Sequence, residues 1–340
     1  MEKLEMQLNK STVISTLVFL LAISASVCAQ SSNSAVLLLQ PLGARGVALG
    51  ESYVAVADGI HSQYWNPAGL AASSRGVQLT YTHRPELVKG VLNYEYGNIA
   101  YQINSRSAIS VNFSYVAFKP ASFQPDDRSS YATGVSYASK LTTNLFAGIT
   151  VKRVSSKIEQ LSAHAFAADI GLLYRIDNVL NTQTVQGQVH LGASLSNVGQ
   201  KIEFFAGQGE PLPRFLRIGF AFDLNSKSRI NTGLRRFGVL LSFEYQNLLN
   251  EQENENIWEW GAGAEFRIIE ILSLRIGYHE RLPKTKQTFI GKTLDTGMTY
   301  GAGLNIPIPP LTLQFDFASA PQNGWVERYE MFTFGVNWGS

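Results

Sequence analysis

The residue types that most often perform chemistry are scattered along this sequence of 340 residues. No two histidines have the His-x-x-x-His spacing by which one helix presents two ligands to zinc. The sequence also lacks the Gly-x-Ser-x-Gly motif, in which a sharp turn exposes a nucleophilic serine. We therefore expect a protein that is not an enzyme and that has no catalytic residues, no cofactor and no metal site. The five histidines are His61, His83, His164, His190 and His279.

The composition is low in charge and rich in glycine and aromatic residues. Charged residues make up only 16% of the sequence, whereas a typical soluble domain has about 25%. Aromatic residues reach 11%, and there are 29 glycines. The net charge of +2 comes with no basic stripe, so we expect no nucleic-acid partner. Such a composition is typical of a transmembrane β-barrel, in which one face of each strand meets lipid and the other meets water.

Residues 1–29 have the features of a secretory signal peptide. Two lysines precede an apolar run at residues 13–27, and Ala29 supplies a small residue for cleavage before Gln30. Lipid attachment to Cys28 is a second option, although the valine before it stands where a lipobox has glycine or alanine. No apolar run of 18 residues follows residue 30, so an exported chain that enters a membrane must cross it as strands.

From Gly76 onward the sequence alternates between apolar and polar residues with a period of two. In SAISVNFSYVAF, for example, Ile109, Val111 and Phe113 share one face, and serine and asparagine side chains share the other. This pattern predicts an even number of strands, about fourteen. The candidates lie near 76–84, 91–103, 106–118, 130–140, 143–154, 162–175, 184–196, 212–224, 236–247, 256–268, 271–280, 296–306, 311–319 and 328–338.

The lengths of the connections favour a closed barrel over a secreted β-sandwich. Every other link is mostly short, as at 141–143 and 269–270, although the links near 176–183 and 225–235 are longer. The remaining links include several long polar loops. Outer-membrane barrels sort their connections in this way, with short periplasmic turns and long external loops, and a sandwich has no reason to do so. We therefore predict an all-β fold, a transmembrane antiparallel β-barrel at residues 76–340.

Charged residues on the predicted strands share the face opposite the bulky apolar residues. At the centre of the bilayer, a lysine or arginine on the lipid-facing side costs roughly 2–4 kcal/mol. The same side chain costs little if it faces a wet lumen, so this set is expected inside the barrel. Its members are Glu244, Glu259, Glu265, Arg267, Arg275 and Asp316.

Residues 30–75 precede the first strand and are too apolar for a disordered tail. Small residues recur from Gly43 to Ala57 and would let the backbone pack closely against other surfaces. Asn66-Pro67 initiates a turn, and Gly69 permits a positive φ. We predict that this segment folds into the barrel as a plug, or hatch. Its candidate motif residues are Asp58, Tyr64, Trp65, Asn66, Pro67, Ala68 and Gly69.

The stretch PLGARGVALGESYVAVADGIHSQYWNPAGLA resembles the N-terminal signature of FadL-like outer-membrane proteins, particularly the PorV/PorQ group. A second segment, from Leu195 to Gly219, is similar to an Asn-x-Gly, Pro-Leu-Pro, Arg-x-Gly pattern of that group. One departure is Asp58-Gly59, where the group commonly has an acidic pair. The resemblance implies a fourteen-stranded barrel with its N-terminal segment inside, in the outer membrane of a Gram-negative-type bacterium and surrounded by outer-membrane lipid.

The resemblance leaves two functions open, because FadL-like members pass hydrophobic small molecules across the membrane and PorV/PorQ-like members serve type IX secretion. The first function predicts an apolar capture site on an external loop. The second predicts that the same loop binds secreted proteins or components of the secretion system. In a third interpretation these residues only cap the barrel rim. Either active function would work by shifting the hatch from the loop at 198–215. The candidate loop residues are Ile202, Phe204, Phe205, Leu212 and Pro213.

Overall fold

The computed structural model describes ten ranges that begin with the predicted hatch. They are residues 35–73, 76–85, 93–118, 128–205, 207, 209–230, 233–249, 257–282, 296–322 and 328–339. The predicted signal peptide, with Cys28, lies outside the described residues. None of the described helices combines the length and the apolar character needed to cross a bilayer.

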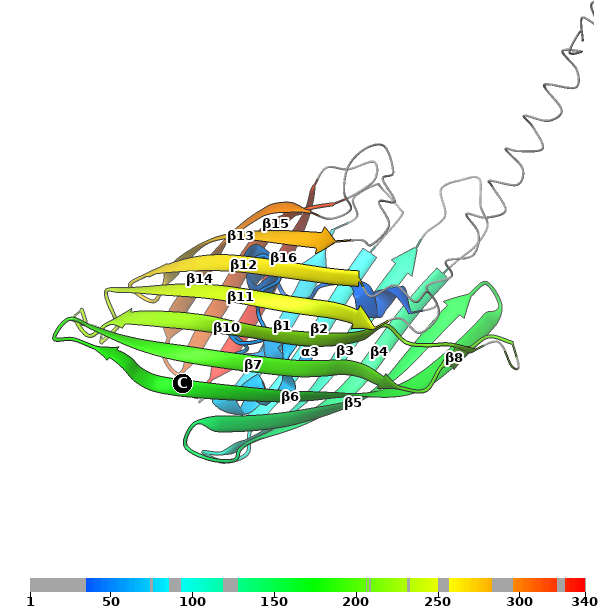
Figure 1. Ribbon diagram of the computed structural model, residues 1–340, viewed down its shortest axis with the longest axis horizontal. Coiled ribbons are helices and arrows are strands. Elements are labelled where there is room, and N and C mark those ends of the chain that lie inside the picture. Colours follow the sequence, from blue (N-terminus) through cyan, green and yellow to red (C-terminus); the bar gives the residue numbers. More distant parts are fainter. Residues whose placement is uncertain are drawn as a thin grey trace, which may run out of the picture. The chain divides into compact units, whose positions relative to one another are not determined.

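Fourteen antiparallel strands form one closed barrel (Figure 1). Each strand pairs with the next along the chain except at β7, which pairs with β10 because β8 and β9 form a separate two-stranded sheet. The barrel closes where Val77 of the first strand pairs with Trp338 of the last. The predicted strand number and closure are therefore confirmed. The barrel strands are β1 (Val77–Arg84), β2 (Asn93–Gln102), β3 (Ser107–Phe118), β4 (Arg128–Lys140), β5 (Leu145–Ile158), β6 (Leu161–Asn181), β7 (Val185–Gly199), β10 (Arg214–Ser226), β11 (Phe237–Leu249), β12 (Ile257–Ile268), β13 (Leu272–Leu282), β14 (Gly297–Ile308), β15 (Leu311–Pro321) and β16 (Arg328–Trp338).

The period-two pattern places apolar side chains outside and polar side chains inside. On β3, Ile109, Val111 and Phe113 are exposed on the outer face, and Ser110 is buried on the inner face. Neighbouring inner hydroxyls bond to one another, as Ser136 does to Thr150 across 2.7 Å. The exposed residues form the apolar belt that an outer-membrane barrel presents to lipid.

The short turns and the long loops lie at opposite ends of the barrel. At one end, turns at 103–106, 141–144, 182–184, 269–271 and 309–310 connect the strands, and β1 begins and β16 ends there. The link at 227–236 lies at the same end and is longer, as the sequence predicted. Because β6 continues to Asn181, the predicted long link near 176–183 is in fact a short turn. The opposite end carries the long loops, apart from the two-residue turn at 159–160. Short turns face the periplasm in this class of barrel, so the long loops are external.

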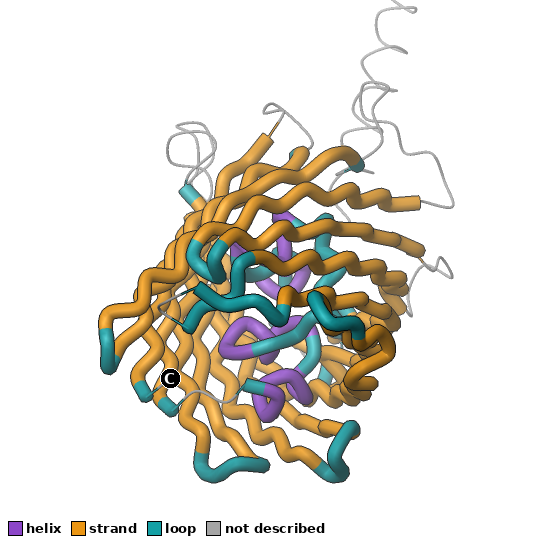
Figure 2. The backbone as a smooth tube through the Cα atoms, turned by 90° about the vertical axis from the view of Figure 1, so that its left-hand side faces the viewer, coloured by secondary structure: helices purple, strands orange, loops and turns teal. Residues whose placement is uncertain are grey.

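Residues 35–73 lie inside the barrel, where Figure 2 shows several short helices surrounded by strands. Leu37 and Leu38 pack beside Ile202 near the long-loop end. Ala71 packs beside Ala108 and Ala138 near the short-turn end, where β1 begins. The segment therefore runs through the lumen from the external end to the periplasmic end. Its helices are η1 (Val36–Leu39), α2 (Ala44–Ala48), η2 (Gly59–His61), α3 (Ser62–Trp65) and η3 (Pro67–Ala72).

Candidate functional site: the hatch and its seat in the lumen

Asn66 makes hydrogen bonds both within the hatch and to the barrel wall. Its side-chain amide donates to the carbonyl oxygen of Val54 and to that of Leu172 on β6, both across 2.9 Å. Its Oδ1 accepts a hydrogen bond from the Ala68 amide at 3.1 Å, which caps η3, and Pro67 stands at the first helical position. The side chain is fully buried. One residue thus starts a helix and holds it against the barrel.

Glycines of the wall allow the hatch backbone to approach directly. A Cβ atom at Gly171 would lie 2.0 Å from Asn66 Oδ1, and one at Gly148 would lie 2.4 Å from the carbonyl carbon of Pro67. Within the hatch, a Cβ atom at Gly69 would lie 2.1 Å from the carbonyl oxygen of Ala57. No side chain fits at these distances, so the hatch backbone can pack this closely only because these three positions are glycines.

Tyr64 and Trp65 fill the middle of the lumen. Trp65 is buried, its indole nitrogen donates to the Leu42 carbonyl at 2.8 Å, and its own carbonyl accepts from Ser194 of β7 at 2.7 Å. The two aromatic rings meet edge to face with centroids 4.9 Å apart. The buried guanidinium of Arg217 on β10 lies 5.2 Å and 5.5 Å from their centroids, within the range of a cation–π interaction. These two aromatic residues are therefore held from both neighbouring wall strands.

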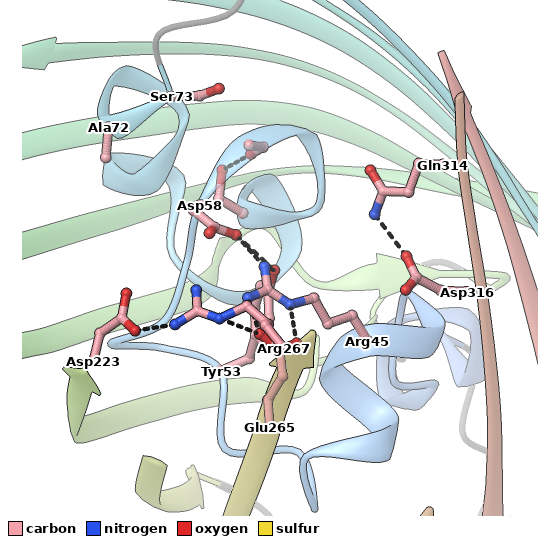
Figure 3. Close-up of polar contacts among 12 residues, drawn as sticks. Arg45, Tyr53, Asp58, Ala72, Ser73, Asp223, Glu265, Arg267, Gln314 and Asp316 are labelled. Carbon is pink, nitrogen blue, oxygen red and sulfur yellow. Dashed lines mark hydrogen bonds and ion pairs between the residues drawn. The ribbon is translucent and has the colours of Figure 1, made fainter. Parts of the chain in front are cut away.

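An ion-pair network ties the hatch to β12 of the wall (Figure 3). Arg45 of α2 donates to both carboxylate oxygens of Glu265 on β12, at 2.8 Å and 2.9 Å, and to Asp58 at 2.7 Å. Glu265 also accepts from Arg275 at 2.6 Å, and Arg275 donates to Asp316 at the same distance. Burial alone would lower the pKa of Arg45, but the carboxylates of Asp58 and Glu265 raise it well above its usual value. The predicted motif residue Asp58 thus pairs inside the hatch.

A second carboxylate holds the hatch through its backbone. Glu244 of β11 is buried and accepts hydrogen bonds from the amides of Tyr53 and Val54, at 2.8 Å and 2.6 Å. Ser52 meets Ser242 of the same strand, with the two hydroxyl oxygens 2.7 Å apart. Sequence reasoning placed Glu244 in the lumen but did not identify Arg45, Tyr53 or Val54 as partners of the wall. The arginine of the Gly-Ala-Arg motif was the available signal.

The structure divides the predicted loop residues into buried and exposed members. Ile202 and Leu212 are buried and pack against Leu37 and Leu38 of the hatch, so they are not the surface contacts that the loop hypothesis required. Phe204 packs partly against the same cluster, and Pro213 is partly exposed. Phe205, with 57% of its surface exposed, is the most accessible of the five. The correction arises because β8 (Ile202–Glu203) pairs with β9 (Gly209–Glu210) and turns Ile202 inward.

His61 is buried in the hatch, and both ring nitrogens lack a hydrogen-bond partner among the described residues. Burial lowers its pKa to about 4, so the ring is neutral at pH 7. The described residues contain no cluster of three or more histidine, cysteine or acidic side chains that could hold a metal ion. A cavity of about 40 Å³ lies between hatch and wall beside Lys152, Asp169 and Arg217. That volume is enough for a few water molecules.

The sequence from residue 29 to residue 242 matches the model of the family described as type IX secretion system protein PorV. The chain belongs to the PorV family. The match includes the whole hatch and the barrel strands from β1 into β11. A search of curated proteins found no match.

Solved structures of a toluene transporter and of a monoaromatic hydrocarbon channel share the fold of this PorV family member. The toluene transporter TodX of Pseudomonas putida is 11% identical with a TM-score of 0.52, and the similarity covers 88% of this chain and 97% of TodX. The CymD monoaromatic hydrocarbon channel is 10% identical with a TM-score of 0.50, covering 87% of this chain and 96% of CymD. At such low identity these similarities show the fold alone.

Proposed function

We propose that this protein is a non-enzymatic component of type IX secretion that binds secreted proteins, or their secretion partners, at its external end. The observation that carries the proposal is the filled lumen of a PorV family barrel. The hatch lies against wall glycines, buries Trp65, and is bonded to the wall from Asn66, Arg45 and Tyr53. A plugged barrel is suited to present a binding surface in the membrane.

The binding surface of this proposal is centred on Phe205. This side chain is exposed beside the β8–β9 sheet, and large exposed aromatic side chains are frequent anchors of protein interfaces. Ile202 in the same loop packs against Leu37 and Leu38 at the start of the hatch. A partner that displaces the loop would therefore disturb the hatch, which couples external binding to the lumen.

The test compares Phe205→Ala with Leu141→Ala in a deletion strain that carries each variant. Leu141 is also 57% exposed but lies in a turn at the periplasmic end, so it controls for loss of exposed apolar surface. We expect Phe205→Ala to reduce the amount of type IX cargo on the cell surface and to raise it in the periplasm. Leu141→Ala should leave both amounts unchanged. Normal surface delivery in the complete deletion strain would contradict the proposal.

Passive transport of hydrophobic small molecules is the second candidate. Inward-facing apolar residues of the external half, including Val116, Val154 and Ala165, form a cluster that the start of the hatch now covers. The cavity of about 40 Å³ borders this cluster at Leu37, Leu38 and Leu42. Displacement of the hatch would open an apolar surface toward the outside. Unchanged uptake of a radiolabelled fatty acid after deletion of the protein would exclude this candidate and leave the secretion proposal intact.

A further inference from the structure

A groove of about 810 Å³ lies on the outer wall where the first and last strands of the barrel meet. Its lining comes from β14, β15 and β16 on one side and from β1, β2, β3 and β4 on the other. Leu79, Ile99 and Phe334 contribute exposed apolar side chains to it. The groove is therefore part of the outward apolar belt.

Gly97 of β2 forms a notch in this groove. It pairs with Tyr81 of β1 on one side and with Phe113 of β3 on the other, and all three residues line the groove. A Cβ atom at Gly97 would have no protein atom within 4 Å. The missing side chain thus leaves open space on the outside of the barrel, unlike Gly171, whose missing side chain admits the hatch.

Three polar side chains border the external end of the notch. Glu95 is the next residue toward the external end on the same face of β2, and it accepts hydrogen bonds from the Tyr81 hydroxyl and, at 2.9 Å, from His83 Nδ1. His83 is 36% exposed and Glu95 is 24% exposed, so the carboxylate is accessible from outside. Glu95 pairs with His83, the next-to-last residue of β1, so its carboxylate lies toward the external end of these two strands.

We propose that this groove is a binding site for one membrane lipid whose headgroup carries an ammonium group. The acyl chain lies on Leu79, Ile99 and Phe334 and fills the notch at Gly97. The ammonium group donates to the Glu95 carboxylate. Tyr81 and His83 hold that carboxylate in place, so the acceptor is positioned before the lipid arrives.

The lipid is favoured as the occupant by the position of the groove and by its charge. The groove is continuous with the lipid-facing belt of the barrel, so acyl chains reach it without leaving the bilayer. A carboxylate with two donors already bound attracts a cationic headgroup and repels an anionic one. A choline headgroup has a positive charge but no N–H donor, so it cannot make this hydrogen bond.

The test uses the full chain in nanodiscs that contain equal amounts of phosphatidylethanolamine and phosphatidylcholine with identical acyl chains. Native mass spectrometry then identifies the lipids that stay bound to the folded barrel. We expect phosphatidylethanolamine to be enriched roughly threefold to tenfold, the ratio that one hydrogen bond supplies. Glu95→Gln should lower the enrichment, and Gly97→Leu should remove one bound lipid.

Gly97→Leu adds its side chain to open space, so folding of the barrel is not threatened. The matched control is Ala264→Leu on β12, which enlarges a small residue of another barrel strand that does not line the groove. It should retain the wild-type lipids. Equal retention of the two lipids by the wild-type chain, or unchanged retention in Gly97→Leu, would overturn the proposal. So would a protein found in the groove in place of lipid, for example by cross-linking from Tyr81 in cells.

Discussion

The side-chain amide of Asn66 occupies the space that a side chain at Gly171 would fill, because a Cβ atom there would lie 2.0 Å from Asn66 Oδ1. The same amide donates to the neighbouring wall carbonyl, that of Leu172. The hatch and the wall are therefore complementary at the level of single atoms. This complementarity explains why a polar residue with a donor and an acceptor is needed at position 66 and a glycine at position 171.

Asn66→Ala should loosen the hatch without opening the barrel. It leaves the carbonyl oxygens of Val54 and Leu172 without this donor in a buried site, which costs roughly 2–3 kcal/mol. Limited proteolysis of the folded barrel, followed by mass spectrometry of the hatch fragments, measures the effect. Gly171→Ala should act in the same direction, and Gly97→Ala is its control because it adds a methyl group to open space. Equal protease resistance of all three variants would show that this contact does not hold the hatch.

Arg45 and Glu265 should be strongly coupled in their effects on the free energy of unfolding. Glu265 is only 1% exposed, so removing Arg45 takes one of its two closest cations away. Breaking a buried pair costs about 3–5 kcal/mol, and we expect Arg45→Met to lower the free energy of unfolding by an amount of that order. Urea titration of the barrel in phospholipid vesicles measures it.

The double variant Arg45→Met, Glu265→Gln decides whether the two residues act together. Because both charges of the pair are removed together, the double variant should lose less free energy of unfolding than the two single variants lose in sum. Strictly additive losses would mean that the observed geometry carries no coupling energy.

The strands were predictable because the alternation of apolar and polar residues is a local pattern. The main error, the predicted end of β6, has a local cause as well. The predicted strand at 162–175 stops early, and the turn-forming residues Asp177 and Asn178 follow its predicted end. In the structure β6 continues to Asn181 through an irregularity in its pairing with β7 between Ile176 and Leu180, where Asn178 has a φ of 58°. A bulge accommodates turn-forming residues inside a strand.

The contacts between hatch and wall could not be predicted from one sequence. Alternation places Glu265 on the inner face, but it does not say at which height or against which residue. Arg45 lies 220 positions away along the chain, and only the strand order and register bring the two together. The same limit applies to Ile202, since a hydrophobic residue in a polar loop has the same pattern whether it faces the solvent or the lumen.

His61 should make a contribution to the stability of the hatch that is lost in mild acid. Burial lowers the pKa of this histidine to about 4, whereas an unfolded chain has a value near 6.5. As the pH falls below about 6.5, the unfolded state takes up a proton that the folded state does not. The stabilisation is therefore complete above about 6.5 and is lost between 6.5 and about 4, by about 3 kcal/mol.

His61→Leu isolates this effect from the other charges around the ring. Asp316, Arg45, Asp58 and Arg275 all act on His61 and are retained in the variant. Urea titrations between pH 7 and pH 4 should show a smaller loss of stability for His61→Leu than for the wild-type chain. Parallel pH profiles would mean that His61 does not control the acid response.

Movement of the hatch is the last expectation, and Ser52 and Ser242 allow a direct test. Their hydroxyl oxygens are 2.7 Å apart, so cysteines at both positions should form a disulfide between hatch and wall. Ser130 and Ser156 are 2.8 Å apart on neighbouring wall strands, and a disulfide there is the control that leaves the hatch free. If binding at the external loop must shift the hatch, the Ser52–Ser242 disulfide should abolish surface delivery of cargo. A reductant should restore delivery, whereas the Ser130–Ser156 disulfide should have no effect under either condition. Full delivery with the hatch disulfide formed would show that the hatch is a fixed part of the barrel, because no movement at Ser52 would then be needed.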